Sequence, residues 1–171
     1  FSNKALALSN KLENNAYMAE SYLDVGECLE YKNQKLDAFR NYLTAIDMAE
    51  KMDNPQLLGK CYLHLASFYN LNKLFDKAII NKLKQGDLVR KELPLDSNAL
   101  MWVQYDLHYF QRRANDQLNF NSVKNLMDFA IRKNNNKLKY YEFGLYRTYL
   151  IDKDRMDLLY DLYINQYPHE L

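Results

Sequence analysis

The sequence predicts an all-α fold, a solenoid of antiparallel helix pairs, and three observations lead to this prediction. The chain has only four glycines and three prolines among 171 residues, which leaves few positions that favour tight turns between strands. Apolar residues recur at the spacing of one helix face. A similar pattern of residues returns after forty positions, which is enough for two helices and their turns.

The clearest predicted helix covers residues 38–52, where apolar side chains form one stripe at the helical period. The stretch Asp53-Asn54-Pro55 ends this helix. Proline suits the first turn of a new helix, and the side chain of Asn54 can cap the free N–H groups of that turn. The next helix is therefore expected over residues 55–70.

The repeat is evident when residues 5–38 are aligned with residues 45–78. The matching positions carry small and aromatic side chains, of the kind found where packed helices touch. Identical residues occur in the pairs Ala5/Ala45, Lys11/Lys51, Asn14/Asn54, Tyr22/Tyr62, Leu23/Leu63 and Ala38/Ala78. Two helices per forty residues are typical of a solenoid, in which each pair buries its apolar face against its neighbours.

This frame predicts a starting helix over residues 1–13 and repeats over about 15–53, 55–92, 96–135 and 137–167, all within one domain spanning 1–171. A leading helix is expected over 97–113, with Asp96 or Ser97 as its cap. A few extra residues in "RRANDQLNFN" predict a longer loop before the next helix, and "DKD" predicts a turn before a last helix over 155–167. Because the chain begins at Phe1 with residues that read as mid-helix, we expect a fragment of a larger protein.

The spacing resembles the tetratricopeptide repeat (TPR), which alternates aromatic and small residues along both helices of each pair. The first unit carries this pattern in Tyr22, Val25, Gly26, Leu29, Ala38, Tyr42 and Ala45, and the second in Tyr62, Leu65, Ala66, Tyr69 and Ala78. Small residues allow helix backbones to approach, and the aromatic rings fill the remaining gaps. The resemblance implies a right-handed α–α superhelix, a TPR-like solenoid of the long, forty-residue type seen in bacterial signalling and regulator proteins.

Members of this family line a concave groove with the first helix of each pair. By this resemblance, the candidate partner-binding residues are Glu20, Leu23, Glu27, Glu30, Lys60, Leu63, Val103, Leu107, Phe110, Tyr141, Leu145 and Tyr149, and Tyr31, Ser67, Asn70, Leu100 and Leu138 occupy further groove positions. The groove would be acidic in its first unit and apolar in its third and fourth. The apolar part allows two interpretations, an open trough for an apolar peptide or amphipathic helix, or a face covered by neighbouring helices, a cap or a second copy.

The resemblance further implies a protein- or peptide-binding scaffold or sensor module of a bacterial signalling or transcription-regulatory protein. An alternative is a receptor domain for a short signalling peptide or small ligand that controls an attached effector domain. Self-association is a further interpretation, in which the partner is a second copy of the chain.

Other function classes lack support in the residues. We predict no enzyme, no cofactor and no metal site, because His64, His108 and His169 stand outside any metal or nucleophile motif and the four glycines form no phosphate loop. With 23 basic and 22 acidic residues, the chain has no net field that would attract nucleic acid. Cys28 and Cys61 are interpreted as buried thiols. No apolar run suits a membrane span, so we predict a cytoplasmic protein, or a periplasmic one if a leader or membrane segment was removed.

Overall fold

The computed structural model describes residues 4, 7, 15–95, 97–114 and 118–167, and these residues are helical with no strand among them. The predicted starting helix over 1–13 lies almost entirely outside the described residues, as does Asp96, one of the two expected caps. Internal contacts divide the chain into two compact units, unit 1 over residues 1–103 and unit 2 over residues 104–171. The all-α prediction is confirmed, and the single domain stays a prediction.

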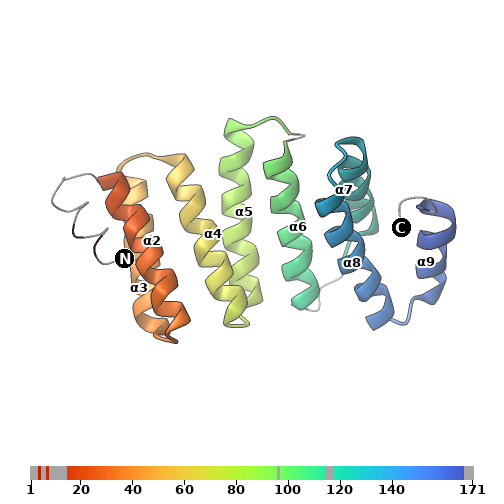
Figure 1. Cartoon of the computed structure of the whole chain (residues 1–171), viewed down its shortest axis with the longest axis horizontal. Coiled ribbons are helices and arrows are strands. Elements are labelled where there is room, and N and C mark those ends of the chain that lie inside the picture. The colour runs from red at the N-terminus through yellow and green to blue at the C-terminus, as the bar shows by residue number, and fades with distance from the viewer. Residues whose placement is uncertain (1–3, 5–6, 8–14, 96, 115–117, 168–171) are drawn as a thin grey trace. The chain divides into compact units, whose positions relative to one another are not determined.

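Unit 1 consists of helices that follow one another at a constant spacing. It contains α2 (Asn15–Tyr31), α3 (Lys35–Lys51), α4 (Pro55–Leu71), α5 (Phe75–Glu92) and the beginning of α6 (Asn98–Arg113). The first four begin at residues 15, 35, 55 and 75, so a helix with its turn takes twenty residues and a pair takes forty. Along the chain, α2 packs against α3, α3 against α4 and α4 against α5, and α2 also contacts α4 (Figure 1). The forty-residue unit is thus a pair of adjacent helices, whereas the right-handed superhelix stays a prediction.

The same turn geometry recurs between the helices. Asn33, Asp53 and Lys73 each adopt a left-handed backbone conformation, with φ of 59°, 47° and 60°. In each turn the N–H of this residue bonds to the carbonyl three positions back, and the next N–H bonds to the carbonyl five positions back. This is the Schellman arrangement, which satisfies carbonyls at a helix C-terminus. A repeated turn of fixed length is what keeps the helices in a regular register.

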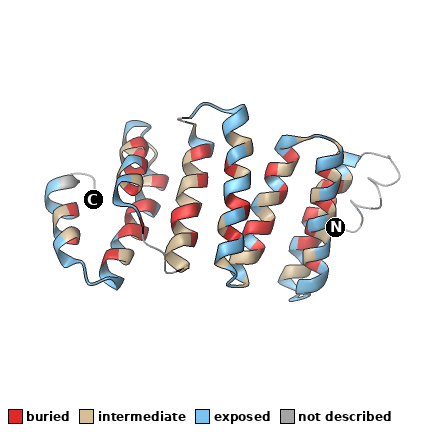
Figure 2. Cartoon of the chain, turned by 180° about the vertical axis from the view of Figure 1, so that it is seen from behind, coloured by how far each residue is buried: buried red, intermediate tan, exposed pale blue. Residues whose placement is uncertain are grey.

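The core of unit 1 is formed by small residues that face aromatic rings. A Cβ atom on Gly26 would lie 2.6 Å from the Cε1 atom of Tyr42, so α2 and α3 can pack this closely only because Gly26 has no side chain. Ala38, Ala45 and Ala49 are fully buried on the facing side of α3. In Figure 2, buried and exposed stretches alternate along the helices of unit 1. This burial agrees with the prediction that Ala38 and Ala45 are small residues at helix contacts.

Unit 2 contains the rest of α6 and a second set of helices, α7 (Phe120–Arg132), α8 (Asn136–Asp152), α9 (Met156–Asp161) and the π-helical turn η1 (Leu162–Gln166). Asn134 and Asp154 form the same left-handed turns as in unit 1, with φ of 50° and 53°. The connection between α6 and α7 spans residues 114–119, whereas the turns of unit 1 span 32–34, 52–54 and 72–74. Residues 115–117 lie outside the described residues, so the longer loop at this position stays a prediction.

Several local predictions can be compared directly with the structure. The side chain of Asn54 accepts a hydrogen bond from the N–H of Leu57 at 3.0 Å and caps α4 as expected, and Ser97 Oγ accepts from the N–H of Leu100 at 3.3 Å. The last predicted helix is interrupted, because α9 ends at Asp161 and continues as η1. Cys61 is buried, but Cys28 is exposed, so the prediction of two buried thiols was wrong for Cys28.

Candidate functional site

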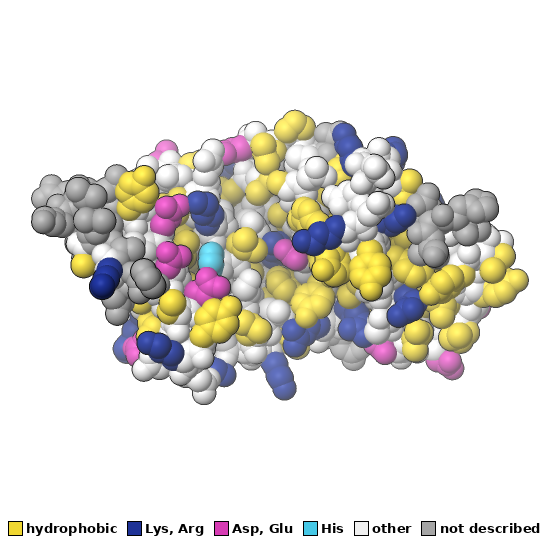
Figure 3. All heavy atoms as spheres, in the orientation of Figure 1, with side chains coloured by type: hydrophobic (Ala, Val, Ile, Leu, Met, Phe, Trp, Pro, Cys, Tyr) yellow, Lys and Arg dark blue, Asp and Glu magenta, His cyan; other side chains and the backbone are white. Residues whose placement is uncertain are grey.

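A cavity of about 670 Å³ opens in unit 1 between the C-terminal half of α2, the beginning of α3 and the C-terminal half of α4. We call it the Glu30 pocket. Its lining residues are Glu27, Glu30, Tyr31, Asn33, Lys35, Tyr42, Leu63, His64, Ser67, Leu71 and Asn72. Figure 3 shows acidic side chains and one histidine gathered over the region of α2 and α4. Glu27, Glu30, Tyr31, Leu63 and Ser67 were all predicted groove positions, and the structure brings these five together.

The helical period explains why these side chains converge. Glu27, Glu30 and Tyr31 are three and four positions apart on α2, so they share one face of the helix. Leu63 and Ser67 have the same relation on α4. The direct contact between α2 and α4 places these two faces at one cavity.

The carboxylate of Glu30 is held in a defined position. The hydroxyl of Tyr42 donates a hydrogen bond of 2.9 Å to Glu30 Oε2. Burial, followed by this hydrogen bond, raises the pKa of Tyr42 well above its usual range, so the phenol remains a donor at any ordinary pH. The second oxygen, Oε1, is buried and has no hydrogen-bond partner. A buried acceptor without a hydrogen-bond partner costs free energy, so a donor supplied by a ligand would stabilise Glu30.

The surroundings of Glu30 add charge and aromatic surface. Among the described residues, neither Glu27 nor Glu30 forms an ion pair, and the single lysine in the lining is Lys35. The ring of His64 lies 6.1 Å from that of Tyr42, centroid to centroid, and Tyr31 is exposed. Two carboxylates against one ammonium group leave the Glu30 pocket acidic, and an exposed tyrosine face can stack on a cation. The arrangement suits a positively charged group with several N–H donors.

Glu20 and Lys60, also predicted groove residues, pair with each other. Lys60 Nζ on α4 lies 2.6 Å from Glu20 Oε1 on α2, and the two residues are forty positions apart. This pairing corrects the expectation that Glu20 contributes to an acidic surface, because its charge is matched by Lys60. Among the predicted groove residues, the acidic character is therefore left to Glu27 and Glu30.

A second, smaller cavity of about 290 Å³ lies between α4 and α5. We call it the Gly59 cavity. It is lined by Pro55, Gln56, Gly59, Lys60, Leu63, Gln85, Leu88, Val89, Glu92 and Leu93. Leu63 belongs to both lining sets, so the two cavities meet at this side chain.

Most side chains of the predicted apolar trough are buried. Val103 in unit 1 and Leu107, Phe110 and Leu145 in unit 2 are buried, and so is Leu23 on α2. Their burial corrects the interpretation of these side chains as an open trough. Tyr141 remains 42% exposed and Tyr149 is half-buried, but their rings contact Tyr105 and Tyr146 of unit 2.

Unit 2 contains a buried polar network that the sequence did not reveal. His108 Nδ1 on α6 contacts Glu142 Oε1 on α8, and both residues are almost fully buried, at 1% and 0% exposure. His108 Nε2 lies 2.9 Å from Ser122 Oγ on α7. The order serine, histidine and carboxylate is that of a nucleophilic relay. However, the amide nitrogen of Gln104, Nε2, lies 2.8 Å from the same His108 nitrogen. The nitrogen that would accept the serine proton therefore already accepts a hydrogen bond from the Gln104 amide. The network connects three helices.

Sequence reasoning missed this network because its members are 14 and 34 positions apart, which is not the repeat period. α6 and α8 begin at Asn98 and Asn136, which is not the forty-residue spacing of unit 1, so these pairings could not be read from the repeat. One signal for this network was present in the sequence, namely polar residues at helix positions where the apolar stripe would be expected.

Further properties of the chain bear on its function class. Within the described ranges, no group of three or more His, Cys, Asp or Glu side chains is placed to hold a metal ion. Likewise, no helix in the described part of the chain is long and apolar enough to cross a membrane. No known family model matches this chain, and no curated protein matches its sequence. The resemblance to the tetratricopeptide repeat therefore stays an expectation drawn from the residues.

Proposed function

We propose that unit 1 binds a peptide segment of a partner protein and that a basic side chain of this segment enters the Glu30 pocket. The observation that carries the proposal is the buried Oε1 atom of Glu30, an acceptor without a partner at the wall of an open cavity. An arginine or lysine side chain supplies both the missing donor and the opposite charge. The exposed ring of Tyr31 adds a surface on which that cation can stack.

The supporting residues come from successive helix pairs, which is how a repeat array recognises an extended chain. α2 provides the carboxylates, and α4 provides Leu63, His64 and Ser67. The volume of about 670 Å³ leaves room for the backbone next to the basic side chain. The role of such a module in a bacterial signalling or transcription-regulatory protein stays a prediction from the resemblance.

The test is the affinity of fluorescently labelled peptides that contain arginine, lysine or glutamine at one position, measured by anisotropy. We expect the arginine and lysine peptides to bind and the glutamine peptide to bind at least about tenfold more weakly, because a charged hydrogen bond is lost. Glu30→Gln should weaken binding of the arginine peptide by a similar factor. Lys35→Gln should strengthen it, because a repelling charge is removed from the lining.

The matched control is Asp47→Asn. Asp47 lies on α3 outside the Glu30 pocket and pairs with Lys51 at 2.6 Å, so its replacement removes the same charge from the same unit. If Glu30→Gln and Asp47→Asn weaken binding equally, the protein attracts peptides only through its net charge and the proposal is wrong. The proposal also fails if no basic peptide binds.

A small ligand with a basic group is the second candidate, and the size of the Glu30 pocket favours it. About 670 Å³ lies within the range of small-molecule sites. This candidate corresponds to the alternative predicted from the sequence, a receptor domain for a short signalling peptide or small ligand. Nα-acetyl-arginine amide would distinguish the two, because it should bind far more weakly than a peptide if the peptide backbone takes part, and about equally if it does not.

A further inference from the structure

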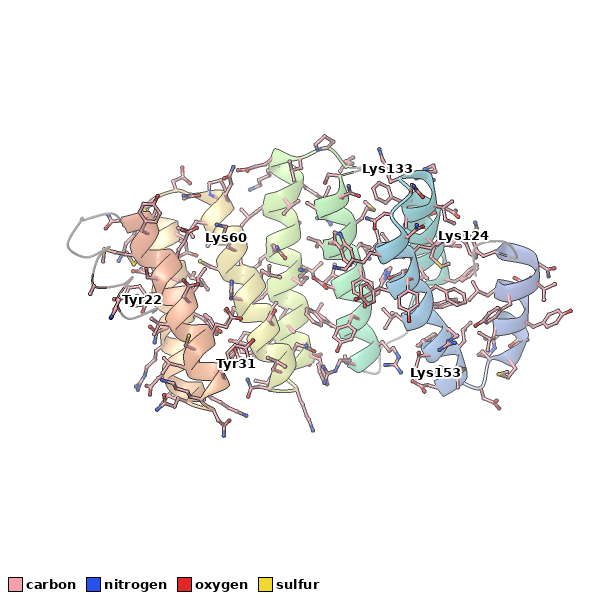
Figure 4. All side chains as sticks on the ribbon, in the orientation of Figure 1. Tyr22, Tyr31, Lys60, Lys124, Lys133 and Lys153 are labelled. Atoms are coloured by element: carbon pink, nitrogen blue, oxygen red, sulfur yellow. The ribbon has the colours of Figure 1, made fainter. Side chains whose placement is uncertain are left out.

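The two cavities of unit 1 lie along one helix, α4. The Gly59 cavity is lined by the N-terminal half of α4 and the Glu30 pocket by its C-terminal half, with Leu63 between them. In Figure 4, Lys60 lies near the upper part of α4 and Tyr31 near the lower end of α2. Leu63 is 36% exposed, so the strip that joins the cavities is open to a ligand.

Gly59 is unusual because helix packing does not require a glycine there. A Cβ atom at this position would meet no atom within 4 Å, although Gly59 is itself buried. Glycine weakens the interior of a helix relative to alanine. Gly26 offers the contrast, since a side chain there would collide with Tyr42. At Gly59 the missing side chain leaves the cavity empty.

Each cavity also holds one buried acceptor that lacks a partner. In the Glu30 pocket it is Glu30 Oε1, and in the Gly59 cavity it is the amide oxygen Oε1 of Gln85 on α5. Apolar side chains at the Gly59 cavity, namely Leu63, Leu88, Val89 and Leu93, surround the space beside Gln85. An apolar side chain suits this space, and the N–H of a peptide backbone suits the amide oxygen.

We infer that the Gly59 cavity is a second subsite for the same peptide, which takes an apolar side chain while the Glu30 pocket takes a basic one. This inference rests on the proposed function, since it names the chemistry of the partner segment in more detail. Lys60 borders the Gly59 cavity, but its charge is matched by Glu20, so it does not repel a basic peptide as a bare lysine would. The partner is therefore a segment that carries a basic residue and an apolar residue at a fixed spacing.

Helix geometry sets the minimum spacing. Gly59 and Ser67, near the middle of the two α4 lining sets, are eight positions apart, which corresponds to about 12 Å along the helix axis. An extended peptide advances about 3.3 Å per residue. The basic and apolar residues should therefore be at least about four positions apart.

The test uses labelled twelve-residue peptides with one arginine and one leucine separated by one to seven positions, and anisotropy as the readout. Affinity should rise about tenfold once the separation reaches about four positions, because the leucine side chain then becomes buried as well. Replacing the leucine by alanine in the best peptide should remove this gain. A separation of one position should give the affinity of an arginine-only peptide.

Gly59→Leu on the protein isolates the second subsite, because it fills the cavity from within. It should lower the affinity of the arginine-leucine peptide to that of the arginine-alanine peptide, and leave the latter unchanged. Gly144→Leu on α8 is the matched control, since a Cβ there also meets no atom within 4 Å and Gly144 lies in unit 2. Gly59→Ala adds only a methyl group, should raise the melting temperature, and should reduce the affinity by a smaller factor.

The outcomes separate the two proposals. If Gly59→Leu and Gly59→Ala both leave the affinity unchanged while Glu30→Gln lowers it, the second subsite is wrong and the Glu30 pocket stands. If replacing the arginine changes the affinity of none of the peptides, the proposed function is wrong, whatever the effect of Gly59→Leu on affinity. If affinity does not depend on the separation between arginine and leucine, the inference is also overturned.

Discussion

The ring of Tyr42 on α3 lies directly beside the backbone of Gly26 on α2, and the space it fills is the space that a Cβ on Gly26 would need. The distance from that Cβ to Tyr42 Cε1 would be 2.6 Å, which no packed pair of carbon atoms accommodates. The same ring carries the hydroxyl that holds Glu30 in the Glu30 pocket. Close helix packing and the position of the candidate site thus depend on one contact.

Gly26→Ala should therefore destabilise unit 1, by about 1 to 3 kcal/mol for overpacking of a buried contact. Gly59→Ala is the matched control, because the same change at a helical glycine with open space should stabilise the protein by about 0.5 to 1 kcal/mol. Urea denaturation followed by Trp102 fluorescence measures both, since Trp102 belongs to unit 1. Equal effects of the two substitutions would contradict the close contact of Gly26 with Tyr42.

The two cysteines should differ sharply in reactivity. Cys61 is fully buried, and burial raises the pKa of its thiol to about 12, so almost none of it is thiolate at pH 8. Cys28 is exposed on α2. Iodoacetamide at pH 8 should modify Cys28 in the native protein and reach Cys61 only after unfolding, as peptide mass spectrometry would report. Rapid native labelling of Cys61 would show that the α3–α4 core opens readily.

The burial of Glu142 beside His108 gives unit 2 a pH dependence with a defined sign. Burial raises the pKa of Glu142 above its ordinary value of 4.5, although His108 opposes this shift. The folded state therefore keeps the proton to a higher pH than the unfolded chain does. This contribution to stability is complete below about pH 4.5 and is lost as the pH rises through the raised pKa.

Glu142→Gln tests this sign, because glutamine has a similar shape and cannot lose the proton. Between pH 4 and pH 7 the stability of the variant should rise relative to the wild type, measured by calorimetric melting of both proteins across the series. Burial raises the pKa of Tyr105, and the charge of Glu142 raises it further. Tyr105 therefore remains protonated between pH 4 and pH 7 and does not contribute to the pH dependence of stability. A relative loss of stability in the variant toward pH 7 would mean that the ion pair with His108 outweighs burial.

The sequence predicts the parts of the fold that depend on local chemistry and on the repeat. Asn54 is a recognisable cap before Pro55, and the helix boundaries around it follow. The forty-residue frame aligns α2 with α4, so Glu27, Glu30 and Leu63 could be assigned to one surface. Glu20 and Lys60 are exactly one period apart, so their pairing was also accessible from the repeat, although the groove assignment treated them separately.

Other features depend on packing that the sequence pattern does not contain. Leu107 and Phe110 have the apolar character of either a groove or a core, and only the helices packed around them decide between the two. The exposure of Cys28 depends on the rotation of α2 against α3. The contact between His108 and Glu142 joins residues 34 positions apart, a spacing that the forty-residue repeat does not predict. Lys73 adopts its left-handed conformation without the glycine or asparagine that would have marked the turn.

The measurement that tests the central claim most directly is a ¹H–¹⁵N NMR titration of the labelled protein with the arginine-leucine peptide. If the peptide binds at α4 as proposed, backbone amide shifts should change at residues 27–35 and 59–72 and saturate together. Amides of α7 and α8 should serve as internal controls with little change. Shift changes confined to residues 118–152, or spread evenly over both units, would contradict the assignment of the Glu30 pocket as the peptide site.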